Sequence, residues 1–232
     1  MKKVAIVQSS YIPWKGYFEL IRAVDELILY DDAQYTTRDW RNRNRIKTPK
    51  GPAWLTVPVE TRGLRFQAVK DVRTAGGDWA KRHWQAIVRS YGKAPYFKRY
   101  APAFMEFYLG RVDRQLSGVN RSLIEIVNGI LDIPTKLSFS MDYGFERRAG
   151  KSEKILDLCR RCGASEYVSG PSAQKYLETD QFEKNGVRVR FSDYSGYPEY
   201  PQLFGPFVHE ISVLDLIFNT GHEASKYMKR PC

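Results

Sequence analysis

The sequence predicts an α/β protein with a mostly parallel sheet flanked by helices, and two observations carry that prediction. Short apolar strand-like segments alternate along the chain with helix-like segments, as in a parallel sheet whose faces are covered by helices. Polar residues gather directly after the first two apolar runs, where open α/β sheets place their ligand sites. The expected strands are 3–8, 26–31, 53–59, 135–140, 166–169 and 187–192, and the expected helices are 15–24, 78–91, 95–110, 118–131, 151–162, 171–178 and 210–219.

Capping and breaking residues set the boundaries of the clearest helices. Asp78 can cap the segment 78–91, which carries an apolar stripe and stops at Gly92. The segment 118–131 has its apolar residues on one side, and it ends before Pro134 because proline cannot continue a helix.

Length and composition indicate one α/β domain over residues 1–232, with a soft joint at 141–152, where the chain is polar and contains two glycines. No apolar run approaches the roughly 20 residues that a membrane-spanning helix needs. The first apolar run is also too short for the core of a signal peptide. We therefore expect a cytoplasmic protein without a membrane span.

The net charge of +11 favours anionic partners such as nucleotides or nucleic acid, although a solvated basic surface is the simpler alternative. The positive charge is concentrated in the segment 38–50, where basic residues are interleaved with Trp40 and Asn42. Cys159 and Cys162 form a C-x-x-C pair, but they share one helix face with apolar neighbours. That pattern predicts core packing instead of redox or zinc chemistry.

The first candidate site is the turn Gln8-Ser9-Ser10 after the first strand. A helix opening near Trp14 would offer its positive dipole end to a phosphate or carboxylate. Gly16 would let a ligand approach the backbone closely. The alternative is an ordinary strand-to-helix turn with an aromatic plug.

The second candidate is the segment 31–47. Asp31 and Asp32 close the second strand, where they could bind a metal, accept hydrogen bonds from ribose hydroxyls or hold a basic partner. Arg43 and Arg45 alternate along an extended strand and would share one face, suited to bidentate phosphate contacts. The alternative is a structural network in which the aspartates neutralise the arginines.

The third candidate follows the strand 166–169, where Ser169, backbone N–H groups and Lys175 could meet an oxyanion or phosphate. The Walker motif G-x-x-x-x-G-K-[ST] is absent from the chain, and a capped helix explains the same residues. The fourth is His209, which precedes the last helix and could act as an acid or base, with His83 as a second such histidine. Either histidine could equally be structural.

These blocks together resemble the WbqC-like family of bacterial proteins. The matching pieces are Gln8, Tyr11 to Phe18, Tyr30 to Tyr35, Asp39 to Lys47, Trp54 to Val59, Ser169-Gly170-Pro171, Tyr200-Pro201-Gln202 and Ser212 to Asp215. One departure is Ser9, where the family usually has proline. The resemblance implies a role in gene clusters for O-antigen and related surface polysaccharides, and so work on nucleotide-linked sugars.

A fold-level analogy connects the N-terminal part to the nucleotidyltransferase superfamily, which carries H-x-G-H at the first helix. Here the same spacing holds Trp14, Lys15, Gly16 and Tyr17, so both histidines are missing. Nucleotide binding is compatible with this change, but adenylyl transfer of the usual kind is not expected. A fold analogy does not supply a function by itself.

The leading hypothesis is a transferase-type enzyme of surface-polysaccharide biosynthesis that binds a nucleotide or nucleotide-linked amino sugar and transfers an acyl or aminoacyl group to it. His209 would be the general base and Asp32 would contact a hydroxyl or amine. The residues assigned to ligand contact are Gln8, Tyr11, Trp14, Gly16, Tyr17, Gln34, Arg43, Lys47, Ser169 and Lys175.

Two other functions stay open at this point: binding of nucleic acid such as tRNA through the basic segment 38–50, and a non-catalytic scaffold in a glycosylation assembly. A nucleotide is the cofactor that the hypothesis implies. The histidines and cysteines offer no transition-metal set, whereas carboxylates together with a phosphate could hold magnesium.

Overall fold

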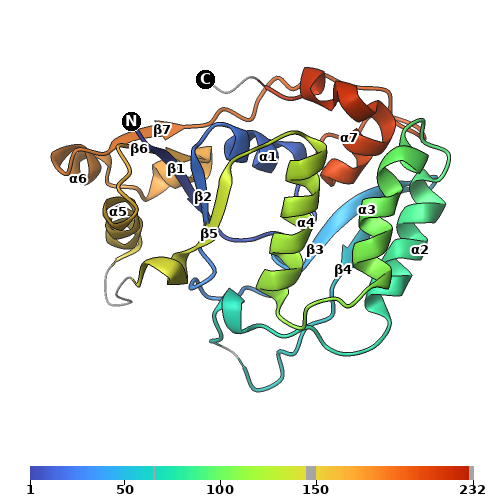
Figure 1. Ribbon diagram of the computed structural model, residues 1–232, viewed down its shortest axis with the longest axis horizontal. Helices are drawn as coiled ribbons and strands as arrows, with labels where there is room; N and C mark the ends of the chain where they lie inside the picture. Colours follow the sequence, from blue (N-terminus) through green and yellow to red (C-terminus); the bar gives the residue numbers. More distant parts are fainter. Residues whose placement is uncertain (65, 145–149, 230–232) are drawn as a thin grey trace.

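Five parallel strands form the central sheet of the computed structural model, which describes residues 1–64, 66–144 and 150–229 (Figure 1). They are β1 Lys3–Val7, β2 Glu26–Leu29, β5 Lys136–Phe139, β6 Glu166–Ser169 and β7 Arg188–Phe191, in the order β5-β2-β1-β6-β7. The chain runs outward from β1 through β2 to β5, and then returns past β1 to β6 and β7. This is the doubly wound, Rossmann-like order, and the predicted α/β class is confirmed.

Helices cover both faces of the sheet. In Figure 1, α5 and α6 lie on one side of the strands, and α1 and α4 lie on the other together with α2, α3 and α7. The helices are α1 Lys15–Arg22, α2 Trp79–Tyr91, α3 Phe97–Leu109, α4 Leu116–Ile130, α5 Lys151–Arg161, α6 Thr179–Lys184 and α7 Val213–Thr220. Within the described residues, no helix combines the length and apolar character that crossing a membrane requires.

Strand β2 shows why its sequence is a continuous apolar run. Leu27 and Leu29 face the hydrophobic cluster beneath α1 and α4, while Ile28 faces the second cluster beneath α5 and α6. Both faces of the strand are therefore buried, as is usual for parallel sheets. Cys159 lies fully buried in the second cluster, where burial raises the pKa of its thiol. This placement agrees with core packing of the C-x-x-C pair.

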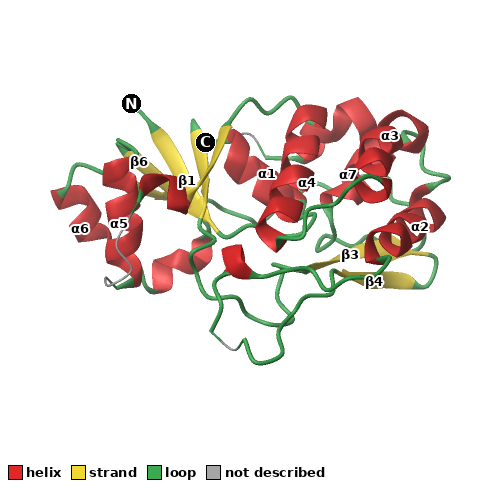
Figure 2. Cartoon of the chain, turned by 60° about the horizontal axis from the view of Figure 1, so that its bottom comes forward, coloured by secondary structure: helices red, strands yellow, loops and turns green. Residues whose placement is uncertain are grey.

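A separate antiparallel hairpin, β3 Arg43–Thr48 and β4 Gly51–Thr56, lies beneath α2 and apart from the parallel sheet (Figure 2). The segment predicted as a strand at 53–59 belongs to this hairpin. Which sheet a strand joins depends on long-range packing, and a local sequence pattern carries no information about that packing.

Two other predictions differ from the structure, and a third is not tested by it. The helix expected at 171–178 is a short 3-10 helix, η3 Pro171–Lys175, and α6 was not predicted. Of the soft joint expected at 141–152, residues 145–149 lie outside the described residues. Asp78 precedes α2 as expected, but its carboxylate pairs with Arg82 and does not cap the helix. The remaining 3-10 helices are η1 Val69–Asp71, η2 Ser140–Tyr143 and η4 Gly221–Tyr227.

The amino end of the sheet is held by Glu26, whose side chain is buried between three strands. Its carboxylate receives Lys2 Nζ at 2.7 Å and Lys136 Nζ at 3.0 Å. Ser138 Oγ donates at 2.6 Å, and the Tyr143 hydroxyl also donates. Burial alone would raise the pKa of Glu26, but these donors outweigh it and lower the pKa to about 2. The carboxylate is therefore stabilised in its charged form.

Replacing Glu26 by glutamine should lower the free energy of unfolding by on the order of 3 kcal/mol at neutral pH. The pKa of Glu26 falls from 4.5 to about 2 on folding, so its contribution is present above pH 4.5 and is lost as the pH falls toward about 2. Urea unfolding over a pH series measures both effects. Glu125→Gln, which removes an exposed i,i+4 partner of Arg121, is the matched control and should cost no more than about 0.5 kcal/mol. A Glu26→Gln curve with wild-type pH dependence would contradict this account.

Candidate functional site

Polar residues follow the carboxyl ends of the parallel strands and meet at one edge of the sheet. Asp31, which follows β2, is fully buried there. Its Oδ1 accepts the backbone N–H of Ser9 at 2.8 Å, and its Oδ2 accepts Ser117 Oγ of α4 at 2.6 Å. Burial raises the pKa of Asp31, although the hydrogen bonds from Ser117 and Ser9 oppose that rise. This carboxylate therefore connects the end of β1, the end of β2 and α4.

The loop before the hairpin folds onto the same edge. Asn120 of α4 donates from Nδ2 to Ser9 Oγ at 3.0 Å and to the carbonyl of Arg41 at 2.9 Å. Arg41 in turn donates to the Ser9 carbonyl at 3.3 Å. The turn after β1 is therefore fixed by protein groups, and Asp31 and Arg41 both belong to this structural network.

The turn also contains a strained residue. Ile12 has a φ of 34°, which a β-branched side chain rarely adopts. Asn44 of β3 donates from Nδ2 to the carbonyls of Tyr11 at 3.1 Å and Ile12 at 2.9 Å. These bonds hold the strained backbone in place and join the hairpin to the start of α1.

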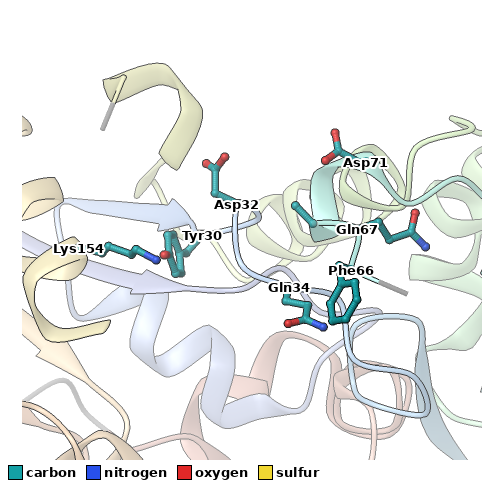
Figure 3. Close-up of a pocket in the computed structure, with 8 residues that line it drawn as sticks. Tyr30, Asp32, Gln34, Phe66, Gln67, Asp71 and Lys154 are labelled. Atoms are coloured by element: carbon teal, nitrogen blue, oxygen red, sulfur yellow. The ribbon is translucent and has the colours of Figure 1, made fainter. Parts of the chain in front are cut away.

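A pocket of about 240 Å³ opens at the same edge, next to the end of β2 (Figure 3). Two carboxylates, two amides, two aromatic rings and a lysine contribute to its lining. The lining residues are Tyr30, Asp32, Gln34, Phe66, Gln67, Ala68, Asp71 and Lys154. They come from the loop after β2, the segment 66–71 and α5, so residues far apart in sequence share one cavity.

Asp32 is the most firmly held acid of this pocket. Its Oδ1 pairs with Lys70 Nζ at 2.6 Å, and its Oδ2 accepts Ser140 Oγ at 2.7 Å. The backbone of the segment 66–71 is brought there by pairing, since Tyr35 N donates to the Gln67 carbonyl at 2.9 Å and Lys70 N donates to the Asp31 carbonyl at 2.9 Å. The carboxylate is oriented before any ligand arrives.

Of the site residues predicted from the sequence, Asp32 and Gln34 are the two that line the pocket. Sequence reasoning missed Tyr30, Phe66, Gln67, Asp71 and Lys154. Tyr30 directly precedes the paired aspartates and could have been found by its position. The other four reach the pocket through tertiary contacts, and no local motif marks them.

An aromatic plug formed by the rings of Trp14 and Tyr17 follows β1, and Gln8 and Gly16 contact these rings. The Tyr17 hydroxyl donates to the Gln8 carbonyl at 3.2 Å. The Trp14 ring packs edge-on against Tyr194 and would overlap a Cβ placed on Gly16. Gly16 therefore admits the chain's own indole, which matches the aromatic-plug alternative more closely than a ligand cradle.

Tyr11 lies at the centre of a buried hydrogen-bonded chain. His83 Nε2 lies 3.2 Å from the Thr56 carbonyl and donates to it, which leaves Nδ1 as an acceptor. The Tyr11 hydroxyl donates to that Nδ1 at 2.7 Å and receives the Tyr108 hydroxyl at 2.6 Å. Burial lowers the pKa of His83 to about 4, so the neutral imidazole is favoured. Tyr11 and His83 are thus engaged in the core.

Arg43 and Lys47 lie on the hairpin and not in the pocket lining. The Arg43 guanidinium stacks 4.2 Å from the centre of the Trp54 ring. Lys47 is buried, donating to Gln202 Oε1 at 2.7 Å and to the Pro206 carbonyl at 2.8 Å. Burial lowers the pKa of the Lys47 ammonium. Its contacts are with the segment that precedes α7.

The remaining assigned residues are spread over other elements. Ser169 is buried beside the Tyr167 hydroxyl at 3.0 Å, and Lys175 is exposed at the end of η3. His209 is exposed and packs against Phe207, 4.6 Å between ring centres. The general-base role of His209 stays a prediction, and its contacts do not connect it to Asp32. Within the described ranges, no group of three or more histidine, cysteine or acidic side chains is placed to hold a metal ion.

Fold and site together define a doubly wound α/β protein with a polar pocket at the carboxyl edge of its sheet. The sequence matches the WbqC-like protein family over residues 8–227, so the chain belongs to that family, as the resemblance predicted. It is also similar to Rv1507c, an uncharacterized protein of Mycobacterium tuberculosis, with 48% identity over 99% of this chain and 98% of the relative. No solved structure matches the chain significantly.

Removing the Tyr11 hydroxyl should destabilise the fold, because Tyr11→Phe leaves His83 Nδ1 without its donor and Tyr108 without its acceptor. We expect a loss of about 1–3 kcal/mol in the free energy of unfolding. The matched control is Tyr176→Phe at a half-exposed ring, which should change stability by less than about 0.5 kcal/mol. Denaturant unfolding compares the two variants. Equal free energies of unfolding for Tyr11→Phe and wild type would show that the buried hydrogen-bonded chain does not stabilise the fold.

Adding a methyl group at Gly16 should also destabilise the protein, since Gly16→Ala forces the Trp14 indole off its packed position. Overpacking of this kind costs typically about 1–3 kcal/mol. Gly129 provides the control, since it is exposed in α4 and an added Cβ would meet no neighbouring atom within 4 Å outside the helix's own backbone. Gly129→Ala should stabilise by about 0.5–1 kcal/mol because alanine is favoured over glycine within a helix. Thermal unfolding measures the melting temperatures of both variants. A Gly16→Ala melting temperature at or above that of the wild type would refute the packing argument.

Proposed function

We propose that this WbqC-like protein binds a nucleotide-linked amino sugar in the pocket at the carboxyl edge of its sheet and transfers an acyl or aminoacyl group to the sugar amine. The pocket lining carries the proposal. Carboxylates accept hydrogen bonds from sugar hydroxyls and amines, and amides both accept and donate them. The rings of Tyr30 and Phe66 offer flat apolar faces to a pyranose. The surface-polysaccharide role that the sequence resemblance implies points to the same substrate class.

The position of the pocket also supports a nucleotide-linked ligand. Open α/β sheets bind their ligands outside the carboxyl ends of the strands. Lys154 lines the pocket from the first turns of α5 and would attract a diphosphate, as would Lys70 beside Asp32. A nucleotide would be the part of the substrate that these cations hold, and magnesium bound between a phosphate and Asp32 or Asp71 is compatible with this arrangement.

In the proposed transfer, the sugar amine attacks the carbonyl carbon of an activated acyl donor. A C–N bond forms, the bond from the carbonyl carbon to the leaving group breaks, and the proton lost by the amine is taken up by a base or the leaving group. We assign Asp32 to hold the amine and receive that proton, because it is oriented by Lys70 and Ser140 at the pocket wall. His209 is less suited to the role, since its contacts lie with the segment before α7.

Asp32→Asn should weaken binding of the nucleotide sugar by about 10- to 100-fold, because a hydrogen bond to a charged group contributes about 1.5–3 kcal/mol. Wild-type protein is first screened by melting temperature against a panel of nucleotides and nucleotide-linked amino sugars, where a ligand at ~100 times its Kd adds roughly 2.7 kcal/mol. Titration calorimetry with the best ligand then compares Asp32→Asn with Asp180→Asn, an exposed aspartate of α6 as control.

Unchanged affinity in Asp32→Asn would remove the pocket from the proposal, provided that the variant melts near the wild-type temperature without ligand. Binding without turnover, tested with activated acyl donors and mass analysis of the sugar, would limit the function to recognition.

A further inference from the structure

Two tryptophans are exposed side by side on the hairpin side of the molecule. Trp40 is 42% exposed and Trp54 is 45% exposed, and their ring centres lie 5.4 Å apart with the planes inclined by 39°. Large aromatic side chains normally bury much of their surface on folding, so a contacting pair left in water is a candidate binding surface.

Arginine side chains surround Trp54. The guanidinium of Arg43 lies 4.2 Å from the Trp54 ring centre, and that of Arg45 lies 5.6 Å from it. Arg45 of β3 is paired directly across from Trp54 of β4, and Arg43 lies two residues before Arg45 on β3. Side chains two residues apart share a face, separated by roughly 7 Å, so both cations point to the side of the hairpin that carries the indole.

The charge around these rings is strongly positive. Residues 38–50 contain six lysines and arginines and one aspartate, within a chain of net charge +11; of these, the buried Lys47 directs its ammonium to Gln202 and Pro206. The Glu210 carboxylate pairs with Arg45 at 2.9 Å, and because that side chain is 81% exposed it can be displaced at little cost; Arg45 also donates to the Glu210 backbone carbonyl at 2.8 Å, a bond that displacement of the carboxylate leaves in place. A partner that covers this surface must therefore bring negative charge together with flat apolar faces.

We propose that this indole–arginine surface, formed by Trp40, Arg43, Arg45 and Trp54, binds an unpaired nucleic-acid strand. Unpaired bases expose their π-faces for stacking on the indoles, and the phosphates that connect them pair with the arginines. A duplex buries the faces of its bases and lacks the first of these contacts. The surface shares no residue with the lining of the sugar pocket, so the inference does not depend on the proposed transfer reaction.

RNA and DNA strands present the same stacking and phosphate chemistry, and the experiment separates them. Fluorescence anisotropy with labelled oligouridylate, oligothymidylate and a duplex of equal length should show tighter binding of the single strands, with affinity falling as salt is added. Tighter binding of the RNA than of the DNA strand would identify RNA as the ligand, and the reverse order would identify DNA. Equal or tighter binding of the duplex would overturn the proposal.

Variants test the individual contacts. Trp54→Ala should weaken binding of the single strand by about 5- to 100-fold, while Trp54→Phe keeps an aromatic face and should retain most of the affinity. Arg43→Ala should reduce the slope of log Kd against log salt by about 0.7, the effect of one lost phosphate contact. Tyr176→Ala, at a half-exposed ring that directly follows η3, and Asp32→Asn in the sugar pocket should bind the strand as wild type does.

The outcomes separate the two proposals. Loss of strand binding in Trp54→Ala with normal nucleotide-sugar binding supports this surface as an independent site. Equal strand affinity in Trp54→Ala, Trp54→Phe and wild type would overturn the stacking role, as would displacement of the strand by a neutral oligosaccharide. Absence of strand binding by the wild-type protein at low salt would also overturn it and would leave the pocket proposal unaffected.

Discussion

The structure depends on one buried carboxylate, that of Asp31. Placed at the end of β2 with no exposure to water, it needs donors to offset the cost of burial, and it receives them from the turn after β1 and from α4. Those contacts fix the separation of the first two strand ends. Through Ser9 and Asn120 the same network reaches the loop of Arg41, which leads into the hairpin. One interaction thus positions the sheet edge, the helix above it and the segment beside it.

At this edge of the sheet, protein side chains fill the turn that follows β1. The aromatic plug of Trp14 and Tyr17 closes the turn after β1, and Asn44 fixes the strained Ile12 beside it. The pocket lies instead next to the end of β2, where the segment 66–71 and α5 complete its lining around Asp32. Binding at this edge would therefore use the end of β2, an inner strand of the sheet, and not the turn after β1.

Membership of the WbqC-like family places this arrangement in a group whose relative in Mycobacterium tuberculosis matches it along nearly its full length. The chain carries two chemically different surfaces. The pocket combines acids, amides and rings in a concave site, whereas the hairpin presents arginines and indoles on an open one. Their separation in the fold means that each can be tested without removing the other.

The sequence by itself determined the α/β class, the positions of the parallel strands and the core role of Cys159, because apolar spacing is a local property that burial on one or two faces imposes directly. It also located Asp32 and Gln34 after β2. Only the tertiary structure decided that Tyr11 and His83 join one buried hydrogen-bonded chain, that Gly16 serves the Trp14 ring, and that Phe66, Asp71 and Lys154 line the pocket. Those outcomes depend on which distant segments pack together, and long-range packing leaves no period or motif in the residues that take part.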